Sequence, residues 1–244
     1  MFYYRMKEAL VKTTIEGSLL IQLITLIINV FGLLVPVDQW DFALKEILGM
    51  ETFVQVVELI FYTWYRGQVI GGAYDVTEFR YFDWFFTTPV MLFSTAAYFG
   101  YLKNEEERGE KKEKEPFSVW AFFKENSQWV SWIFFLNLMM LVFGYLQEID
   151  VLSIVWSSIL GYSSLLGSFG ILYTKFVSQT SKEQWLFWFM FSAWSLYGVA
   201  AMFPNVQKNI SYNILDIFAK NFYGLFLSGI LFMKSTQTKE TKQG

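Results

Sequence analysis

Apolar residues gather in seven long stretches along this chain, and mostly short polar segments separate them. A helix needs about 20 apolar residues to cross the hydrocarbon core of a bilayer. Each stretch therefore predicts one membrane-spanning helix. Together they predict an all-α membrane protein with a single domain, residues 1–244, built as a seven-transmembrane helix bundle. The predicted spans are 16–35, 47–65, 80–102, 128–146, 151–176, 184–203 and 211–233.

The segment 103–127, between the third and fourth predicted spans, is rich in alternating Glu and Lys residues. This charge pattern predicts a solvated loop. The apolar run 117–123 inside it is too short to cross a membrane, so we expect it at the membrane interface or at the start of the next helix. Lys and Arg accumulate in this loop and after the last span, as they do in cytoplasmic loops. We therefore predict an extracellular N-terminus, a cytoplasmic loop 103–127 and a cytoplasmic C-terminus.

Composition excludes several classes of function. The chain of 244 residues is 54% hydrophobic and 21% aromatic, which fits a protein that has the lipid bilayer as a partner. It contains no Cys and no His, so thiol nucleophiles, histidine-based triads and His or Cys metal sites are excluded. The net charge of −3 provides no electrostatic attraction for nucleic acid. We expect neither an enzyme nor a metal protein, and no nucleic-acid partner.

Lys220 lies in the middle of the last apolar stretch. An ammonium group at this depth of a bilayer is costly, so an intramembrane lysine is a hypothesis for a functional site. Asp216 comes one helical turn earlier on the same face and can act as its counter-charge. Lysine also forms Schiff bases. This span alone fits either a Schiff-base site or a structural ion pair.

The third predicted span carries a second group of charges. Arg80, Asp83, Thr87, Met91 and Ser94 follow one another at intervals of three or four residues, so they share one face of a helix. Charged residues within a span face the interior of the bundle. Hydrogen bonds that only stabilise the contact between helices do not need Arg80 and Asp83 on this span together with Lys220 on another. The two spans together therefore favour a functional site.

The run Arg-Tyr-x-Asp-Trp-x-x-Thr-Thr-Pro at 80–89, with Asp-x-x-x-Lys at 216–220, resembles the microbial (type 1) rhodopsins. The resemblance extends over essentially the whole chain and implies the family's seven-helix fold. It also implies that all-trans retinal is the cofactor. Related proteins are often trimers or pentamers, so a homo-oligomer is expected.

The resemblance also implies roles for individual residues. Lys220 would carry the protonated Schiff base, Asp83 would be its primary counter-ion and proton acceptor, and Asp216 would be the second counter-ion. Arg80 would lie on the outward side, and Thr87 would hydrogen-bond Asp83. Trp194 and Tyr197 would also touch Asp216. The side chains expected to line the chromophore are Trp84, Thr88, Met91, Trp194 and Tyr197.

Ser94 departs from the pattern of outward proton pumps, which usually carry a carboxylate at this position. The resulting signature is Asp-Thr-Ser (DTS), and a hydroxyl group cannot act as the proton donor. Glu51, toward the cytoplasmic end of the second span, is a candidate replacement. Met91 stands where related green-absorbing pumps have Leu or Met, which implies green absorption.

Glu58 lies two helical turns after Glu51, on the same inward face of the second span. Together with Ser18 and Asn221 it resembles the central Ser-Glu-Asn gate of channelrhodopsins. An interhelical hydrogen-bond cluster without conduction is the alternative. The pattern Gln-x-x-Glu-x-x-Phe-Tyr-x-Trp at 55–64, with Asn213, resembles rhodopsins encoded by large algal viruses. That subgroup includes both pumps and channels.

Three functions therefore remain open for this chain. The sequence favours a retinal-binding photoreceptor that pumps protons outward, from the Schiff base to Asp83. The alternative is a light-gated cation channel that uses Ser18, Glu58 and Asn221 as its gate. A sensory photoreceptor ranks third, because the sequence contains no evident module for a transducer. The transported partners would be protons or cations, and the expected location is the plasma membrane or a host-cell membrane.

Overall fold

The computed structural model describes residues 2–72, 76–110 and 115–243, and the regular secondary structure in this part of the chain is all helical. Two 3-10 helices, η1 (Gln39–Asp41) and η2 (Val177–Gln179), accompany the α-helices. A π-helical turn, η3 (Ile217–Asn221), joins α8 to α9. The α-helices are α1 (Phe2–Leu34), α2 (Phe42–Ile70), α3 (Thr77–Glu110), α4 (Val119–Glu125), α5 (Ser127–Glu148), α6 (Ile154–Lys175), α7 (Gln184–Ala200), α8 (Asn205–Asp216) and α9 (Phe222–Gln243).

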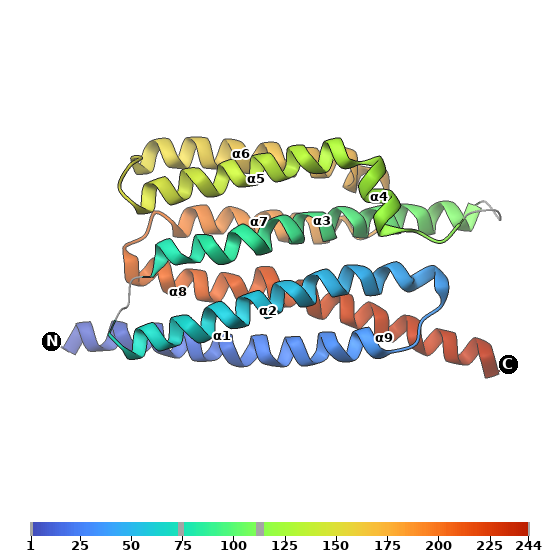
Figure 1. Ribbon diagram of the computed structural model, residues 1–244, viewed down its shortest axis with the longest axis horizontal. Helices are drawn as coiled ribbons and strands as arrows, with labels where there is room; N and C mark the ends of the chain where they lie inside the picture. Colours follow the sequence, from blue (N-terminus) through green and yellow to red (C-terminus); the bar gives the residue numbers. More distant parts are fainter. Residues whose placement is uncertain (1, 73–75, 111–114, 244) are drawn as a thin grey trace.

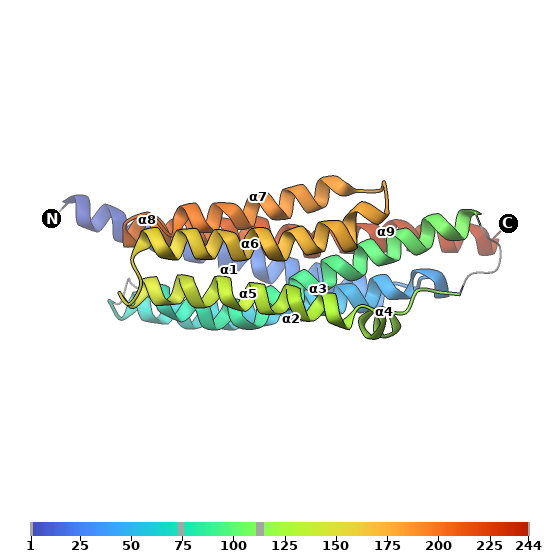
Figure 2. The ribbon, with the colours of Figure 1, turned by 90° about the horizontal axis from the view of Figure 1, so that it is seen from above.

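The long helices lie side by side along one axis and form a single elongated bundle (Figures 1 and 2). Successive helices pack against one another, and α1 also packs against the continuous rod made by α8, η3 and α9. The short helix α4 lies near the end of the bundle where the chain terminates (Figure 1). The N-terminus and the C-terminus lie at opposite ends (Figure 1), which is the arrangement expected for an odd number of crossings.

Each of the seven predicted spans falls on one long helix or on the rod from α8 to α9. Within the described residues, five helical segments are long and apolar enough to cross a membrane: 9–34, 39–70, 127–148, 154–179 and 205–237. Helix α7 is not among these segments because its 17 residues are fewer than a full span needs. Helix α3 is long enough to cross a membrane but is not apolar enough, because polar and charged side chains occupy its buried face.

The prediction of a loop over 103–127 is wrong for most of this segment. Helix α3 continues to Glu110, and α4 occupies 119–125, while residues 111–114 lie outside the described part of the chain. The charges stabilise a longer helix, because Glu105 pairs with Lys182 at 2.7 Å and with Lys234 at 2.6 Å. Burial alone would raise the pKa of Glu105, but hydrogen bonds from these two lysines outweigh it and lower that pKa.

The apolar run 117–123 contributes the separate helix α4 and does not begin α5. The Ser118 hydroxyl caps α4 by accepting a hydrogen bond from the Ala121 amide at 3.3 Å. Phe122 is buried, with its ring centroid 5.3 Å from that of Phe176. A Cβ atom on Gly100 of α3 would lie 2.7 Å from the Phe122 ring, so a glycine at this position allows α4 to pack closely.

The bundle has an apolar exterior and a partly polar interior. Large apolar side chains such as Leu20, Ile60 and Phe82 point outward and are exposed. Buried apolar clusters fill the two ends of the interior, one around Leu48, Phe99 and Leu227 and another around Ile15 and Tyr65. Between them lies a buried group of charged side chains: Glu58, Arg80, Asp83, Asp216 and Lys220. An apolar exterior suits a hydrocarbon environment, where the charged groups must face inward.

Candidate functional site

Lys220 lies on η3, the π-helical turn between α8 and α9. Its side chain is 3% exposed. Single π-helical turns inside longer helices are frequent at functional sites, because the extra residue changes the direction of the neighbouring side chains. Asn221, the next residue, donates from Nδ2 to the Asp216 main-chain oxygen at 3.5 Å. The turn therefore places the lysine amine inside the bundle with Asp216 close to it.

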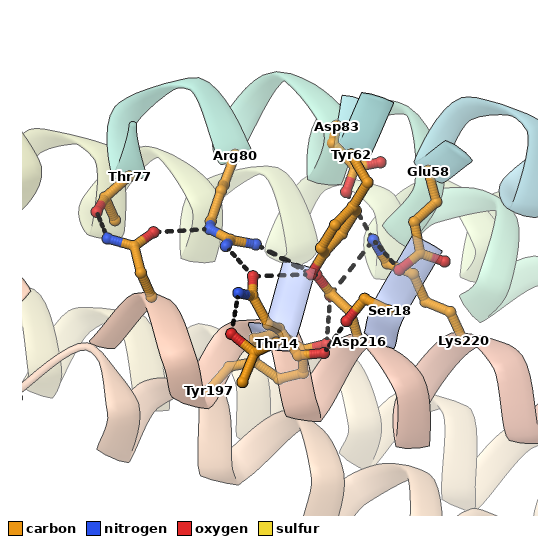
Figure 3. A network of polar contacts seen from close by, with 12 residues as sticks. Thr14, Ser18, Glu58, Tyr62, Thr77, Arg80, Asp83, Tyr197, Asp216 and Lys220 are labelled. Atoms are coloured by element: carbon orange, nitrogen blue, oxygen red, sulfur yellow. Dashed lines mark hydrogen bonds and ion pairs between the residues drawn. The ribbon is translucent and has the colours of Figure 1, made fainter. Parts of the chain in front are cut away.

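Three buried carboxylates surround the Lys220 amine (Figure 3). Nζ donates to Oδ2 of Asp83 at 2.6 Å. It lies 3.4 Å from Oδ1 of Asp216 and 3.8 Å from Oε1 of Glu58. A buried ammonium needs such partners, because an unpaired charge in an apolar interior is very costly. The structure brings together the predicted pair Asp83 and Asp216, and it adds Glu58 as a third carboxylate.

Two tyrosines hold Asp216 in place. The Tyr197 hydroxyl donates to Oδ1 of Asp216 at 2.6 Å, so the predicted contact between these residues is present. The Tyr62 hydroxyl donates to Oδ2 at 2.7 Å. Tyr62 was not predicted as a site residue, although it is the tyrosine of the pattern at 55–64. Charge-assisted hydrogen bonds of this kind orient a carboxylate and stabilise its ionised form.

Arg80 lies one turn before Asp83 on α3, and its guanidinium reaches across the interior toward α2 and α8 (Figure 3). Its guanidinium donates to Asn209 at 3.2 Å, to Asn213 and to the Tyr62 hydroxyl at 3.3 Å, and it lies 3.4 Å from Asp216. Neither asparagine was predicted as a site residue, although both continue the helical spacing of 216 and 220 on one face. Four aromatic rings surround the guanidinium at 5.0 to 5.6 Å: Phe61, Tyr62, Tyr65 and Tyr212.

Thr87 reaches Asp83 through the main chain. Its hydroxyl donates to the Asp83 main-chain oxygen at 3.0 Å, so the predicted hydrogen bond does not involve the carboxylate. A threonine in a helix readily donates to the carbonyl four residues earlier, and this local bond uses the only proton of the hydroxyl. Among the described residues, Oδ1 of Asp83 has no hydrogen-bond partner.

A cavity begins at Lys220 and lies between α3, α5, α6 and α7. Mostly apolar and aromatic side chains from these helices form its wall, including Met140, Leu141 and Leu165. Asn137 of α5, which the sequence analysis missed, donates to the Thr88 hydroxyl at 2.8 Å. All five side chains predicted to touch a chromophore line this cavity: Trp84, Thr88, Met91, Trp194 and Tyr197.

Comparison with known proteins identifies the family. Residues 13–233 match the sequence family described as bacteriorhodopsin-like protein. The chain belongs to this family of microbial rhodopsins. A search of the curated proteins finds no match to the chain. The crystal structure of the viral rhodopsin OLPVRII is similar, with 26% sequence identity and a TM-score of 0.75 over 91% of this chain and 97% of that one.

More distant structures share the rhodopsin fold. Blue light-absorbing proteorhodopsin from Med12 has 19% identity and a TM-score of 0.67, over 94% of this chain and 98% of that one. Xanthorhodopsin, described as a light-driven ion pump with a dual chromophore, has 17% identity and a TM-score of 0.66, over 96% of each chain. The present rhodopsin is therefore a multi-helix membrane protein, as its apolar helices also indicate.

A second polar group lies in the half of the rhodopsin that carries the C-terminus. The Ser94 hydroxyl of α3 donates to Oε1 of Glu51 on α2. Both residues are fully buried, and the second oxygen of Glu51 has no hydrogen-bond partner among the described residues. Gln55, one turn closer to Glu58, is likewise buried without a partner for its amide in this part of the chain. Helix α2 thus carries a line of buried polar groups from the Lys220 cluster toward Ser94.

The three candidate gate residues of the rhodopsin do not bond to one another. The Ser18 hydroxyl donates to the Asn213 main-chain oxygen at 2.9 Å, and Asn221 bonds to the Asp216 main chain. Both oxygens of Glu58 lack hydrogen-bond partners among the residues described, and its nearest charge is Lys220. The structure brings Glu58 to the central cluster, while Ser18 and Asn221 are bonded to main-chain oxygens of α8.

Proposed function

We propose that this rhodopsin is a photoreceptor that binds all-trans retinal on Lys220 and uses light to pump protons outward. The observation that carries the proposal is the contact between Lys220 Nζ and Oδ2 of Asp83 at 2.6 Å. At this distance a proton on the lysine nitrogen needs almost no displacement to reach an acceptor. The pattern at 55–64, with Asn213, and the similarity to OLPVRII support placing the chain, with its DTS signature, in the viral subgroup.

The residues of the cavity fit retinal. A polyene requires a long apolar wall with one polar end, and among the described residues that line the cavity Lys220 is the only charged one. Trp84 and Trp194 supply flat apolar surface. When attached to Lys220 as a Schiff base, retinal supplies the absorption of light and the movement of the nitrogen relative to its carboxylates.

The surrounding side chains determine where the proton goes. Asp83 is positioned to accept it from Nζ. Asp216 receives hydrogen bonds from Tyr62 and Tyr197 and lies beside Arg80, so it remains the ionised partner that keeps the site close to neutral. Arg80 and the asparagines around it lie toward the N-terminus, which defines the proposed exit side.

The proposed topology has seven spans, an extracellular N-terminus and a cytoplasmic C-terminus. The opposite positions of the two chain ends and the excess of Lys and Arg near the C-terminal side support it. The protein would lie in the plasma membrane or a host-cell membrane. A homo-oligomer, either trimer or pentamer, is proposed from the family resemblance alone.

Glu51 is proposed as the group that returns a proton to Lys220. Ser94 cannot act as this donor, but its hydroxyl contacts the Glu51 carboxyl group. Glu51→Gln should slow decay of the deprotonated state by about 10² to 10⁴ fold, the usual contribution of a positioned acid. Ser94→Asp should speed the decay at alkaline pH by adding a second carboxylate. Flash photolysis measures both rates. Glu46→Gln, on an exposed carboxylate of the same helix, is the matched control. Unchanged decay in both test variants would contradict the role of Glu51.

A cation channel is the second candidate, favoured by the buried and unbonded Glu58 carboxylate beside Gln55. Whole-cell voltage clamp with independently varied sodium and proton gradients separates the two functions. For a pump we expect outward photocurrent at zero voltage in symmetric solutions. Illuminated cells should acidify an unbuffered medium, and a protonophore should abolish this. Glu58→Gln should change the kinetics and leave the sign of the current unchanged.

A channel would give a different result in the same experiment. Its current would vanish at zero voltage in symmetric solutions, and its reversal potential would follow one of the gradients. That outcome would replace the pump with a channel. Glu58→Gln should then change ion selectivity.

A further inference from the structure

Glu183 occupies an unusual position where the chain enters α7. Its backbone has φ of 52°, in the left-handed region that residues other than glycine seldom adopt. Although it occupies the N-cap position of α7, its side chain does not cap the helix. The carboxylate instead accepts a hydrogen bond from the Tyr98 hydroxyl of α3. Unfavourable backbone conformations tend to persist where the surrounding structure requires them, often at functional positions.

Tyr98 connects this carboxylate to the buried interior. Its ring is almost fully buried and packs against Phe226 of α9, with ring centroids 5.7 Å apart. Tyr223, one turn earlier on α9, is fully buried and belongs to the same buried cluster as Tyr98. Its hydroxyl has no hydrogen-bond partner among the described residues. Two buried tyrosine hydroxyls, those of Tyr98 and Tyr223, therefore lie inward of Glu183.

The inner end of this series is Glu51. Ser94 and Tyr98 lie one helical turn apart on α3, and both are buried. Ser94 in turn donates to Glu51. This face of α3 therefore joins the Glu183 carboxylate, through Tyr98, to the buried carboxylate proposed to serve Lys220.

The outer end of the series lies among charged side chains. Glu105 pairs with Lys182 and Lys234, and Lys234 also lies 3.3 Å from Asp41. Asp41 accepts a hydrogen bond from Tyr101 at 2.5 Å. Clustered surface charges raise the local concentration of counter-ions. A carboxylate at the edge of such a cluster is well placed to take up protons from solvent.

We infer that Glu183 is the cytoplasmic entry point for protons and that Tyr98 and Tyr223 relay them to Ser94 and Glu51. This inference rests on the proposed pump and on Glu51 as its internal donor. Glu183 takes one proton from solvent and passes it to the Tyr98 oxygen. Each hydroxyl along the way accepts one proton and releases another, directly or through water. Glu51 is reprotonated at the end, and no other group changes charge.

The test compares Glu183→Gln and Tyr98→Phe with wild type. A pH-indicator dye measures proton uptake after a flash, and time-resolved infrared spectroscopy follows the Glu51 carboxyl. Both variants should delay uptake and Glu51 reprotonation by at least about tenfold, the effect of removing a positioned acid or relay. Azide, a small weak acid that carries protons independently of the relay, should restore the rates. Unchanged visible absorption shows that both variants fold.

Glu106→Gln is the matched control. Glu106 also joins the α6–α7 connection to α3, through Ser181, but it does not contact Tyr98. It should therefore leave uptake unchanged. If the control slows uptake equally, or if azide does not restore the rates in the test variants, Glu183 and Tyr98 have only a structural role. Normal uptake in both test variants would overturn the route, while slow decay in Glu51→Gln would leave the pump intact. A wild type without proton uptake would overturn the pump itself.

Discussion

Lys220→Ala should leave the protein colourless after addition of all-trans retinal. In the described part of the chain, Lys220 is the only lysine that lines the cavity, and its nitrogen is the atom that would form the Schiff base. Without that bond, retinal has neither a covalent attachment nor the buried positive charge that the carboxylates stabilise. Absorption spectra of the purified protein, before and after hydroxylamine treatment, measure the effect. We expect complete loss of the visible band.

Loss of colour must be distinguished from loss of folding. Removing the cation leaves three carboxylates facing one another, and breaking a buried ion pair typically costs about 3–5 kcal/mol. Lys220→Arg keeps the charge but cannot form a Schiff base, so it should also be colourless. Lys208→Ala is the control, because Lys208 is the other buried lysine in the described chain and pairs with Glu148 at 2.9 Å outside the cavity. A coloured, hydroxylamine-sensitive Lys220→Ala protein would refute the site.

Asp83→Asn should shift the absorption to longer wavelength and stop light-driven proton release. Asp83 is the carboxylate closest to the Lys220 nitrogen, so it stabilises the positive charge there most strongly in the dark state. A neutral amide removes that stabilisation of the dark state. It therefore narrows the energy gap to the excited state, in which the positive charge has moved away from the nitrogen. The amide also cannot accept the proton, so release should fall by about 10² fold or more.

Acidifying the wild type provides an independent check. Once Asp83 binds a proton, its charge is lost as in the asparagine variant, so the same red shift should appear as the pH falls. Asp41→Asn, which neutralises a carboxylate bonded to Tyr101 at the other end of the bundle, should change neither colour nor release. Unaltered colour in Asp83→Asn would contradict the assignment. A blue-absorbing wild type would contradict the green colour expected from Met91.

Much of the central cluster was predictable because its members are local in sequence. Asp216 and Lys220 are one turn apart, and Arg80, Asp83 and Thr87 follow helical spacing. Side chains at such intervals share a face whatever the rest of the chain does. The cost of burying charge in a membrane then requires those faces to point inward. The length and apolarity of the stretches likewise predicted the long helices.

Helix ends were predicted less well, for a physical reason. Hydropathy marks where a helix leaves the apolar region, but the helix can continue in water if its charges find partners. Helix α3 extends to Glu110 because Lys182 and Lys234, distant in sequence, pair with Glu105. The apolar run 117–123 becomes a separate helix because Phe122 finds a buried position against Phe176.

Spacing along the chain did not determine which helices meet, although the family resemblance implied the contacts of Lys220 with Asp83 and of Tyr197 with Asp216. Spacing within one helix defines a face, but it does not determine the rotation and axial register between helices, which depend on packing over their whole length. The rotation and register of the helices bring Glu58 to Lys220 and Arg80 to Asp216. They also bring Ser94 into contact with Glu51, and Glu183 into contact with Tyr98. The sequence by itself determined which helix faces carry the chemistry, and the packing of those helices determined which side chains meet.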